Sequence, residues 1–223
     1  MEALSVTQEY LMFALEKNKG KLGSSEQELL FMVAGGIIEL LSGGYIVHAE
    51  KGKLVQGKAL ENDLPYLKSL YTLITSQKKP KDVGEIGIRY LSGLTDKILI
   101  ELMQSICLSL VEAGCAEEVT VAGLFGEKKR YLVSPCALDV IIAKLREGLL
   151  KNEPLSTDVA CLALMLEKSD FLGRYFSKYE NKRFKTQLKE AHSNESNELL
   201  KEVLDAYESL YISVFVTATM GTH

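Results

Sequence analysis

The chain has 223 residues, which suit one large domain or two small ones, and its 47% of apolar residues is enough to build a hydrophobic core. A formal net charge of −4, from 26 lysine and arginine against 30 aspartate and glutamate residues, disfavours a protein that binds nucleic acid mainly by neutralising phosphates. The four cysteines include no CxxC pair, so the sequence indicates neither a zinc site nor a disulfide framework and fits a reducing cytoplasm.

The first two predicted helices each begin with a capping-box pattern. Ser5 and Gln8 have the spacing at which a side chain and a backbone N–H satisfy each other at a helix start. The apolar residues that follow continue this helix until a glycine ends it. Ser25 and Glu28 repeat the pattern and predict a second helix over about 26–41.

The second helix is strongly apolar, because residues 29–47 carry a single charge, Glu39. A helix that spans a bilayer needs about 20 consecutive apolar residues. This stretch is interrupted by Glu39 and then by a glycine pair, of which Gly43 is available for a left-handed helix end. We therefore predict a buried core helix, and we predict no export because the N-terminus has acidic residues where a secretory signal is basic.

Two short β-type runs, YIVHAE and KLVQG, follow this helix and predict a hairpin, so that the segment resembles the end of a winged helix. Further helices are predicted over 63–77 and, from a weaker pattern, over 81–93. Thr95 should cap a strong helix that ends at Gly114. The expected core contacts join Val33, Ile37 and Leu40 to Ile98, Leu102 and Ile106.

A second hairpin is predicted from residues 118–125 and 128–133, with its turn at Gly126–Glu127. The predicted fold class is mainly α: a single globular domain over residues 1–223, with a core of buried helices and two β-hairpins. The remaining helices are expected over 135–150, 156–168, 170–191 and 196–219.

The sequence contains no recognisable catalytic constellation. Walker A, GxSxG and GxGxxG patterns are absent, and the three histidines lie in different segments. We therefore predict no catalytic residue, metal ligand or cofactor. The basic clusters are more informative: Lys128, Lys129 and Arg130 follow Phe125 at the predicted hairpin tip, and five cations crowd residues 178–189. Such clusters are usually a solvated face, but they also suit anionic lipid headgroups.

Several segments follow one another in a distinctive order: EYLMFALEKNKGKL, IIEL, GGYIV, LVEAG, LFGEKKRYLV, LALMLEKSDFL and NKRFK. Their order and spacing resemble the Golgi phosphoprotein 3 domain family over nearly the whole chain. Its characterised members resemble peripheral membrane adaptors that bind phosphatidylinositol 4-phosphate and hold glycosyltransferases in the Golgi, and their hairpin supports oligomer formation and membrane contact. The chain begins almost at its first predicted helix and thus looks like a bacterial member.

The resemblance also implies a headgroup pocket, built in the family from a tryptophan and three arginines. The equivalent positions in this chain are Ser24, Val33, Ile100 and Met103, and all four depart from that pattern. Val33 and Met103 cannot make the charge-assisted contacts that arginine makes with phosphate. We therefore expect only weak attraction to anionic headgroups.

These observations favour a non-enzymatic adaptor that touches the cytoplasmic face of a membrane or a protein partner, and that forms homo-oligomers through its hairpin. The alternative is a regulatory protein whose winged-helix-like segment binds nucleic acid or a protein partner. The acidic total and the apolar helix before the wing disfavour groove recognition. An enzyme is the third hypothesis, without a nucleophile and base to support it.

Overall fold

The computed structural model describes residues 3–22, 26–91, 96–123, 126–150 and 155–193, together with residues 201, 205, 206 and 212. The chain divides into two compact units. The first contains Met1–Leu22 and Leu110–Glu202, and the second contains Gly23–Ser109 and Val203–His223. The described residues are mainly helical with two two-stranded antiparallel sheets, as the sequence predicts.

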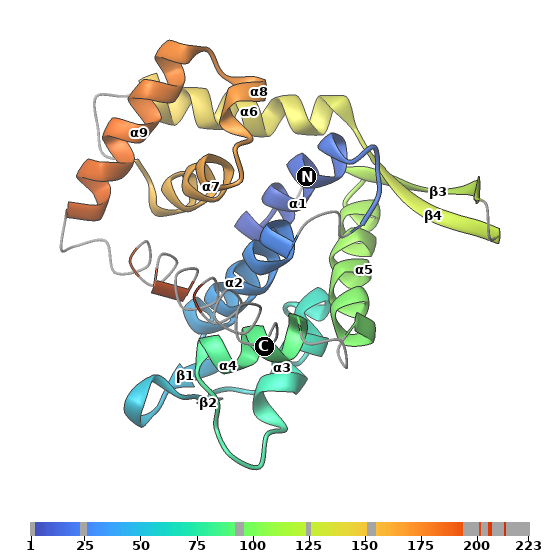
Figure 1. Ribbon diagram of the computed structural model, residues 1–223, viewed down its shortest axis with the longest axis vertical. Helices are drawn as coiled ribbons and strands as arrows, with labels where there is room; N and C mark the ends of the chain where they lie inside the picture. The colour runs from blue at the N-terminus through green and yellow to red at the C-terminus, as the bar shows by residue number, and fades with distance from the viewer. Residues whose placement is uncertain are drawn as a thin grey trace, which may run out of the picture. The chain divides into compact units, whose positions relative to one another are not determined.

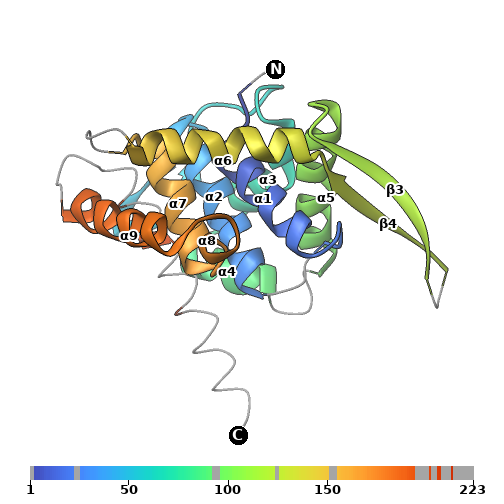
Figure 2. The same cartoon turned by 90° about the horizontal axis from the view of Figure 1, so that it is seen from above.

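In the first unit, α1 lies at the centre. It contacts α6, α7 and β4, while α9 contacts α6, α7 and α8. The long helix α6 and the two-stranded sheet are seen most clearly in Figure 2. The elements of this unit are α1 (Val6–Lys17), β3 (Ala116–Gly123), β4 (Gly126–Val133), α6 (Pro135–Leu150), α7 (Thr157–Lys168), α8 (Leu172–Tyr175) and α9 (Lys178–Ser193).

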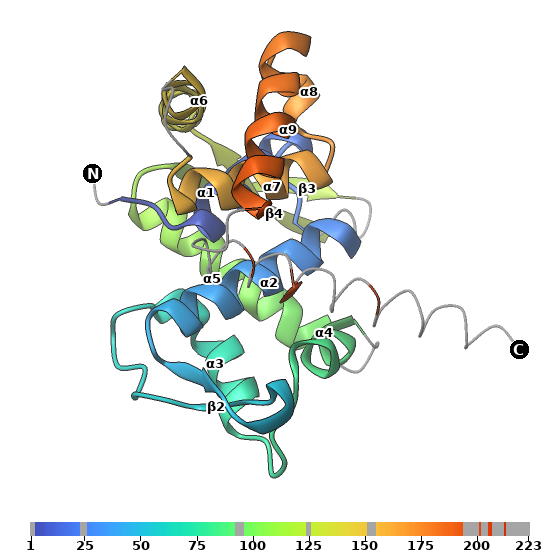
Figure 3. The same cartoon turned by 90° about the vertical axis from the view of Figure 1, so that its left-hand side faces the viewer.

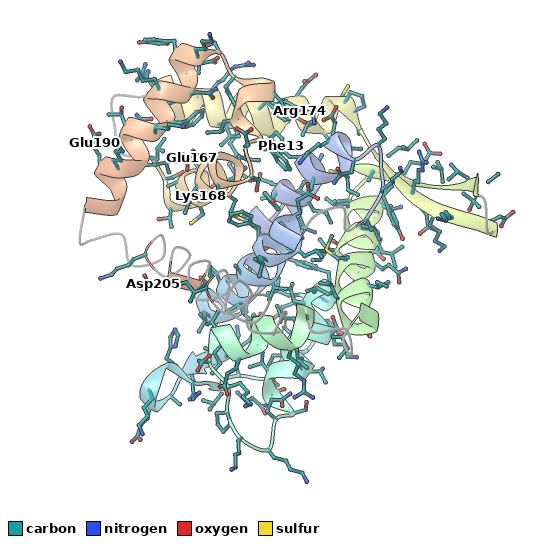
Figure 4. All side chains as sticks on the ribbon, in the orientation of Figure 1. Phe13, Glu167, Lys168, Arg174, Glu190 and Asp205 are labelled. Atoms are coloured by element: carbon teal, nitrogen blue, oxygen red, sulfur yellow. The ribbon has the colours of Figure 1, made fainter. Side chains whose placement is uncertain are left out.

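The start of α1 confirms the predicted capping box. The Ser5 backbone N–H donates to Gln8 Oε1 at 2.9 Å, and the Gln8 N–H donates to Ser5 Oγ at 3.3 Å. Every residue from Thr7 to Leu15 is buried, so α1 is surrounded rather than amphipathic. Phe13 points toward α8 (Figure 4), where the ring of Tyr175 meets it edge-on with 4.9 Å between ring centroids.

A buried ion cluster lies between α1, α6 and α7. Lys144 Nζ is 3.0 Å from Glu9 Oε2 and 2.9 Å from Asp158 Oδ2. The Glu9 side chain is only 6% exposed, whereas that of Lys144 is 33% exposed. Burial raises the pKa of the Glu9 carboxyl above its ordinary value, and the hydrogen bond and charge of Lys144 oppose that shift. Lys144 thus offsets part of the free-energy cost of burying the Glu9 carboxylate in this unit.

The second unit contains α2, the apolar helix predicted over about residues 26–41. Phe31, Ile37 and Leu40 are fully buried. Glu39, the single charge within residues 29–47, accepts a hydrogen bond from the Tyr66 hydroxyl at 2.8 Å. Among the residues that the structure describes, no helix combines the length and apolar character needed to cross a bilayer.

Helices α3 and α4 and strand β1 of the second unit pack against this helix (Figure 3). Helix α3 contacts α2 and β2, and α4 contacts α2. The elements are α2 (Glu26–Ser42), β1 (Ile46–His48), β2 (Leu54–Gln56), 3₁₀ turns over Glu50–Gly52 and Pro65–Leu67, α3 (Lys68–Thr75), α4 (Val83–Leu91) and α5 (Asp96–Glu112), whose last residues belong to the first unit.

An ion-pair network joins β2 to the start of α4. Lys53 Nζ lies 2.8 Å from Asp82 Oδ2 and 2.7 Å from Glu85 Oε2, and Lys81 also reaches Glu85 at 2.7 Å. Hydrogen bonds from Lys53 and Lys81 lower the pKa of Glu85 to about 2. All these side chains are about one third exposed, so solvent screening keeps the contribution to stability small.

The structure confirms one predicted helix end and corrects another. Gly114 has φ +70°, as expected for a residue that ends α5. At the end of α2, the left-handed residue is Gly44 rather than Gly43, so that prediction is wrong by one position. The Gly44 N–H donates to Leu41 O and the Tyr45 N–H to Leu40 O, which makes Gly44 the first residue beyond the helix in a Schellman motif.

The helix predicted over 170–191 is interrupted, and that prediction is wrong in its extent. Phe176 is extended between α8 and α9, with its ring packed edge-on against Phe184. A new capping box starts α9: the Ser177 N–H donates to Glu180 Oε2, and the Glu180 N–H donates to Ser177 Oγ. The caps expected at Ser25 and Thr95, and most of the helix expected over 196–219, lie outside the described residues.

Candidate functional site

The β3–β4 hairpin projects away from the helices of its unit (Figure 1). Its eight residue pairs run from Ala116 opposite Val133 to Gly123 opposite Gly126. Gly126 and Glu127 therefore belong to β4, and the prediction that they form the turn is wrong. A single glycine in the sequence does not distinguish a turn from the end of a strand, because it is compatible with both.

The register divides the side chains of the hairpin between two faces. Residues directly opposite each other in an antiparallel pair share a face, and faces alternate along each strand. The pairs on the first face, which we name the basic face, are Glu117 with Leu132, Val119 with Arg130, and Val121 with Lys128. The pairs on the opposite face are Glu118 with Tyr131, Thr120 with Lys129, and Ala122 with Glu127.

The three adjacent cations predicted as one cluster are thus separated by the register. Lys128 and Arg130 lie on the basic face, and neither has an ion-pair partner among the residues that the structure describes. Lys129 lies on the opposite face, with its Nζ 2.7 Å from Glu118 Oε1. The hydrogen bond from Lys129 lowers the pKa of the Glu118 carboxyl below its ordinary value. Phe125 lies outside the described residues.

The basic face also carries the apolar residues Val119 and Val121, which the sequence predicts as part of an exposed hairpin edge, and Leu132 in addition. Leu132 is 45% exposed, and Val119 and Val121 are half-buried. Successive side chains of a strand point to opposite faces, so a strand over these residues places Lys128, Arg130 and Leu132 on the same face. The basic face therefore combines two cations and three aliphatic side chains with one carboxylate, Glu117.

The base of the hairpin is attached through backbone atoms. The Tyr131 N–H donates to Gly20 O at 2.9 Å. Gly20 has φ +77°, and a Cβ at this position would lie 2.9 Å from Tyr131 O. Position 20 therefore requires glycine both for its conformation and for the close approach of β4.

The three family-equivalent headgroup positions that the structure describes carry apolar side chains. Val33 and Met103 are core residues, 2% and 3% exposed, whereas Ile100 is 51% exposed. Ser24 lies outside the described residues. The three described side chains offer no cation and no hydrogen-bond donor, so they cannot supply the directional contacts of a phosphate site.

A second basic surface lies along α9. Lys178, Lys182, Lys185 and Lys189 follow i, i+4, i+7 and i+11 spacing, so they share one ridge of the helix. Lys185 Nζ is 3.6 Å from Glu167 Oε1 of α7, which is marked in Figure 4. Phe184 and Leu188 are buried. The ridge is thus a charged, outward surface of a helix that packs through Phe184 and Leu188.

Within the described part of the chain, no group of three histidine, cysteine, aspartate or glutamate side chains is arranged to hold a metal ion. None of the four cysteines is in a disulfide, and Cys136 is exposed. The described surface features are charged and lie on an arm and a helix ridge. The described residues therefore form a mainly helical protein with a charged projecting arm.

The chain matches the family model described as Golgi phosphoprotein 3 (GPP34) over residues 6–209, and it belongs to this family. The match covers most of both units, so the resemblance found in the sequence is confirmed. At the level of the family, the chain is a Golgi phosphoprotein-like protein of the non-enzymatic adaptor type. Comparison with the curated proteins gives no match.

Proposed function

We propose that this protein is a peripheral adaptor that meets the cytoplasmic face of an anionic membrane through the basic face of its β3–β4 hairpin. The observation that carries the proposal is the separation by register: Lys128 and Arg130 lie on one face with Val119 and Val121, while Lys129 pairs with Glu118 on the other. Cations beside aliphatic side chains suit the boundary between headgroups and acyl chains.

The proposed contact is weak and depends on salt. A cation near an anionic bilayer contributes about 1 kcal/mol, so Lys128 and Arg130 together contribute about 2 kcal/mol. A Debye length of about 8 Å at physiological salt screens this attraction. Stable attachment therefore needs a second contact, from the lysine ridge of α9, a protein partner or another copy of the chain joined through the hairpin.

The first prediction concerns the two faces of the hairpin. Lys128→Ala with Arg130→Ala should lower partitioning onto phosphatidylserine vesicles about thirtyfold, the equivalent of about 2 kcal/mol. Lys129→Ala should lower it less than about threefold, because the charge of Lys129 is already offset by Glu118. Vesicle flotation at low salt measures both. Equal losses from the two variants would show that bulk charge, rather than the basic face, governs binding.

The second prediction concerns lipid specificity. Vesicles with phosphatidylinositol 4-phosphate should bind within about threefold of phosphatidylserine vesicles at matched surface charge. The physical reason is that Val33, Ile100 and Met103 provide no side-chain donor to a phosphate. Flotation at low and high salt is the measurement. A strong preference for the phosphoinositide that persists at high salt would show that this chain builds a headgroup site from other residues.

A further inference from the structure

The second unit contains an open polar pocket that neither the sequence motifs nor the hairpin accounts for. Its volume is about 510 Å³, which lies in the range of small-molecule sites. Residues from three helices that are separated in the sequence line it. The polar and charged ones on which the inference depends are Lys68, Ser69 and Thr72 of α3, Arg89 of α4, and Glu101 and Ser105 of α5.

The helical spacing explains why these side chains share the pocket. Ser69 and Thr72 are three residues apart on α3, and Glu101 and Ser105 are four apart on α5. Residues with these spacings lie on the same face of a helix. The apolar Ile98 is a further lining residue from α5, so the site combines polar groups with a hydrophobic contact surface, as ligand sites usually do.

Several of these polar groups lack a protein partner. Among the described residues, neither Lys68 nor Glu101 has an ion-pair or hydrogen-bond partner. Ser69 Oγ is inaccessible to solvent and also has no partner. Buried hydroxyl groups are normally hydrogen-bonded, because an unsatisfied one loses its water contacts without replacement. Lys68 and Glu101 are exposed in the pocket, so a ligand there can pair with both, whereas it cannot reach the inaccessible Ser69 Oγ.

The charges of the lining restrict the class of ligand. Lys68 and Arg89 are cations, and Glu101 is the one carboxylate of the described lining. Arg89 Nη1 already donates to Gln77 Oε1 at 3.0 Å, but a guanidinium has five N–H donors, so others remain. A simple anion such as phosphate would be repelled by Glu101, and a simple cation would be repelled by Lys68 and Arg89.

We propose that this pocket binds a small zwitterion with net negative charge, of the class of the acidic amino acids. The carboxylates of such a ligand would meet Lys68 and Arg89, and its ammonium would meet Glu101. The pocket and the hairpin belong to different units, so ligand binding and vesicle binding are separate measurements, and either proposal can fail without the other.

Calorimetric titration of the full chain tests the charge pattern directly. L-glutamate should bind with a dissociation constant on the order of 1 mM or tighter. Glutarate lacks the ammonium and should bind at least about tenfold more weakly, since a charged hydrogen bond is lost. L-lysine should give no binding heat. Glutarate that binds as tightly as L-glutamate, inorganic phosphate that binds more tightly, or no heat at ~10 mM L-glutamate would each overturn the proposal.

Two variants, each with a control that makes the same change outside the pocket, test which group of the ligand Glu101 and Lys68 bind. Glu101→Gln should weaken L-glutamate about tenfold and strengthen glutarate, so that the order of the two ligands reverses. Lys68→Gln should weaken both ligands about tenfold. Glu61→Gln and Lys51→Gln make the same changes at exposed positions of this unit outside the pocket, and should change neither affinity. An unchanged ligand order in Glu101→Gln would overturn the assignment of the ammonium to Glu101.

Discussion

Leu102→Ala should lower the free energy of unfolding by about 2–5 kcal/mol. Leu102 is fully buried on α5, so the shorter side chain loses its burial and leaves a cavity that the neighbouring residues fill only in part. Urea denaturation followed by circular dichroism gives the measurement. The expected range is a large part of the stability of an ordinary domain.

The matched control for this change lies on the same helix. Leu108 is 45% exposed, so Leu108→Ala removes the same atoms from a position that already contacts water. It should alter the free energy of unfolding by no more than about 0.5 kcal/mol. A near-zero effect of Leu102→Ala would show that α5 is peripheral to the cooperative core.

The second large effect is expected for Lys144→Met, which should destabilise the protein by about 3 kcal/mol at pH 7. The change leaves the buried carboxylate of Glu9 without its cation, 3.0 Å away in the wild type. This value is at the low end for breaking a buried pair because the Lys144 side chain is one third exposed. Urea unfolding at neutral pH measures it.

The pH dependence of this loss has a definite sign. In the wild type, burial raises the folded-state pKa of Glu9 above 4.5, so the folded protein binds a proton more tightly than the unfolded chain does. Stability therefore falls as pH rises between the ordinary and the raised pKa. Removing Lys144 should raise that pKa further. The loss from Lys144→Met should thus shrink toward pH 4.5, where Glu9 becomes protonated; a loss independent of pH would contradict this account.

Glu9→Gln provides the double-mutant control. The neutral amide needs no cation, so Lys144→Met should destabilise much less in the Glu9→Gln background than in the wild type. If both backgrounds lose the same free energy, Lys144 would act through its ion pair with Asp158 or through packing of its aliphatic stem, rather than through Glu9.

Helix boundaries were predictable where a local signal was unambiguous. The capping box of Ser5 and Gln8 is such a signal, and the structure confirms it. The Ser177–Glu180 box has the same form but was missed, because apolar residues on both sides continue the helical period. The break at Phe176 depends on packing against Phe184, and this long-range contact cannot be inferred from spacing alone.

The candidate sites depend even more on tertiary structure. The sequence identifies Lys128, Lys129 and Arg130 as adjacent cations, but only the strand pairing shows that Lys129 faces Glu118. Likewise, Lys68, Arg89 and Glu101 are widely separated in the sequence and come together only when α3, α4 and α5 fold. Local patterns therefore specify the elements, whereas the register and packing of those elements specify the sites.

The backbone contact between Gly20 and Tyr131 bears on how this family can diversify. It holds the base of the hairpin through a carbonyl and an N–H, groups that every non-proline residue provides. Beyond the buried Tyr131, the side chains of the arm are then under little constraint from folding. Natural variation or protein engineering can change the charge of the arm while the helices that carry it stay intact, so the same scaffold can be adapted to membranes of different composition or to protein partners.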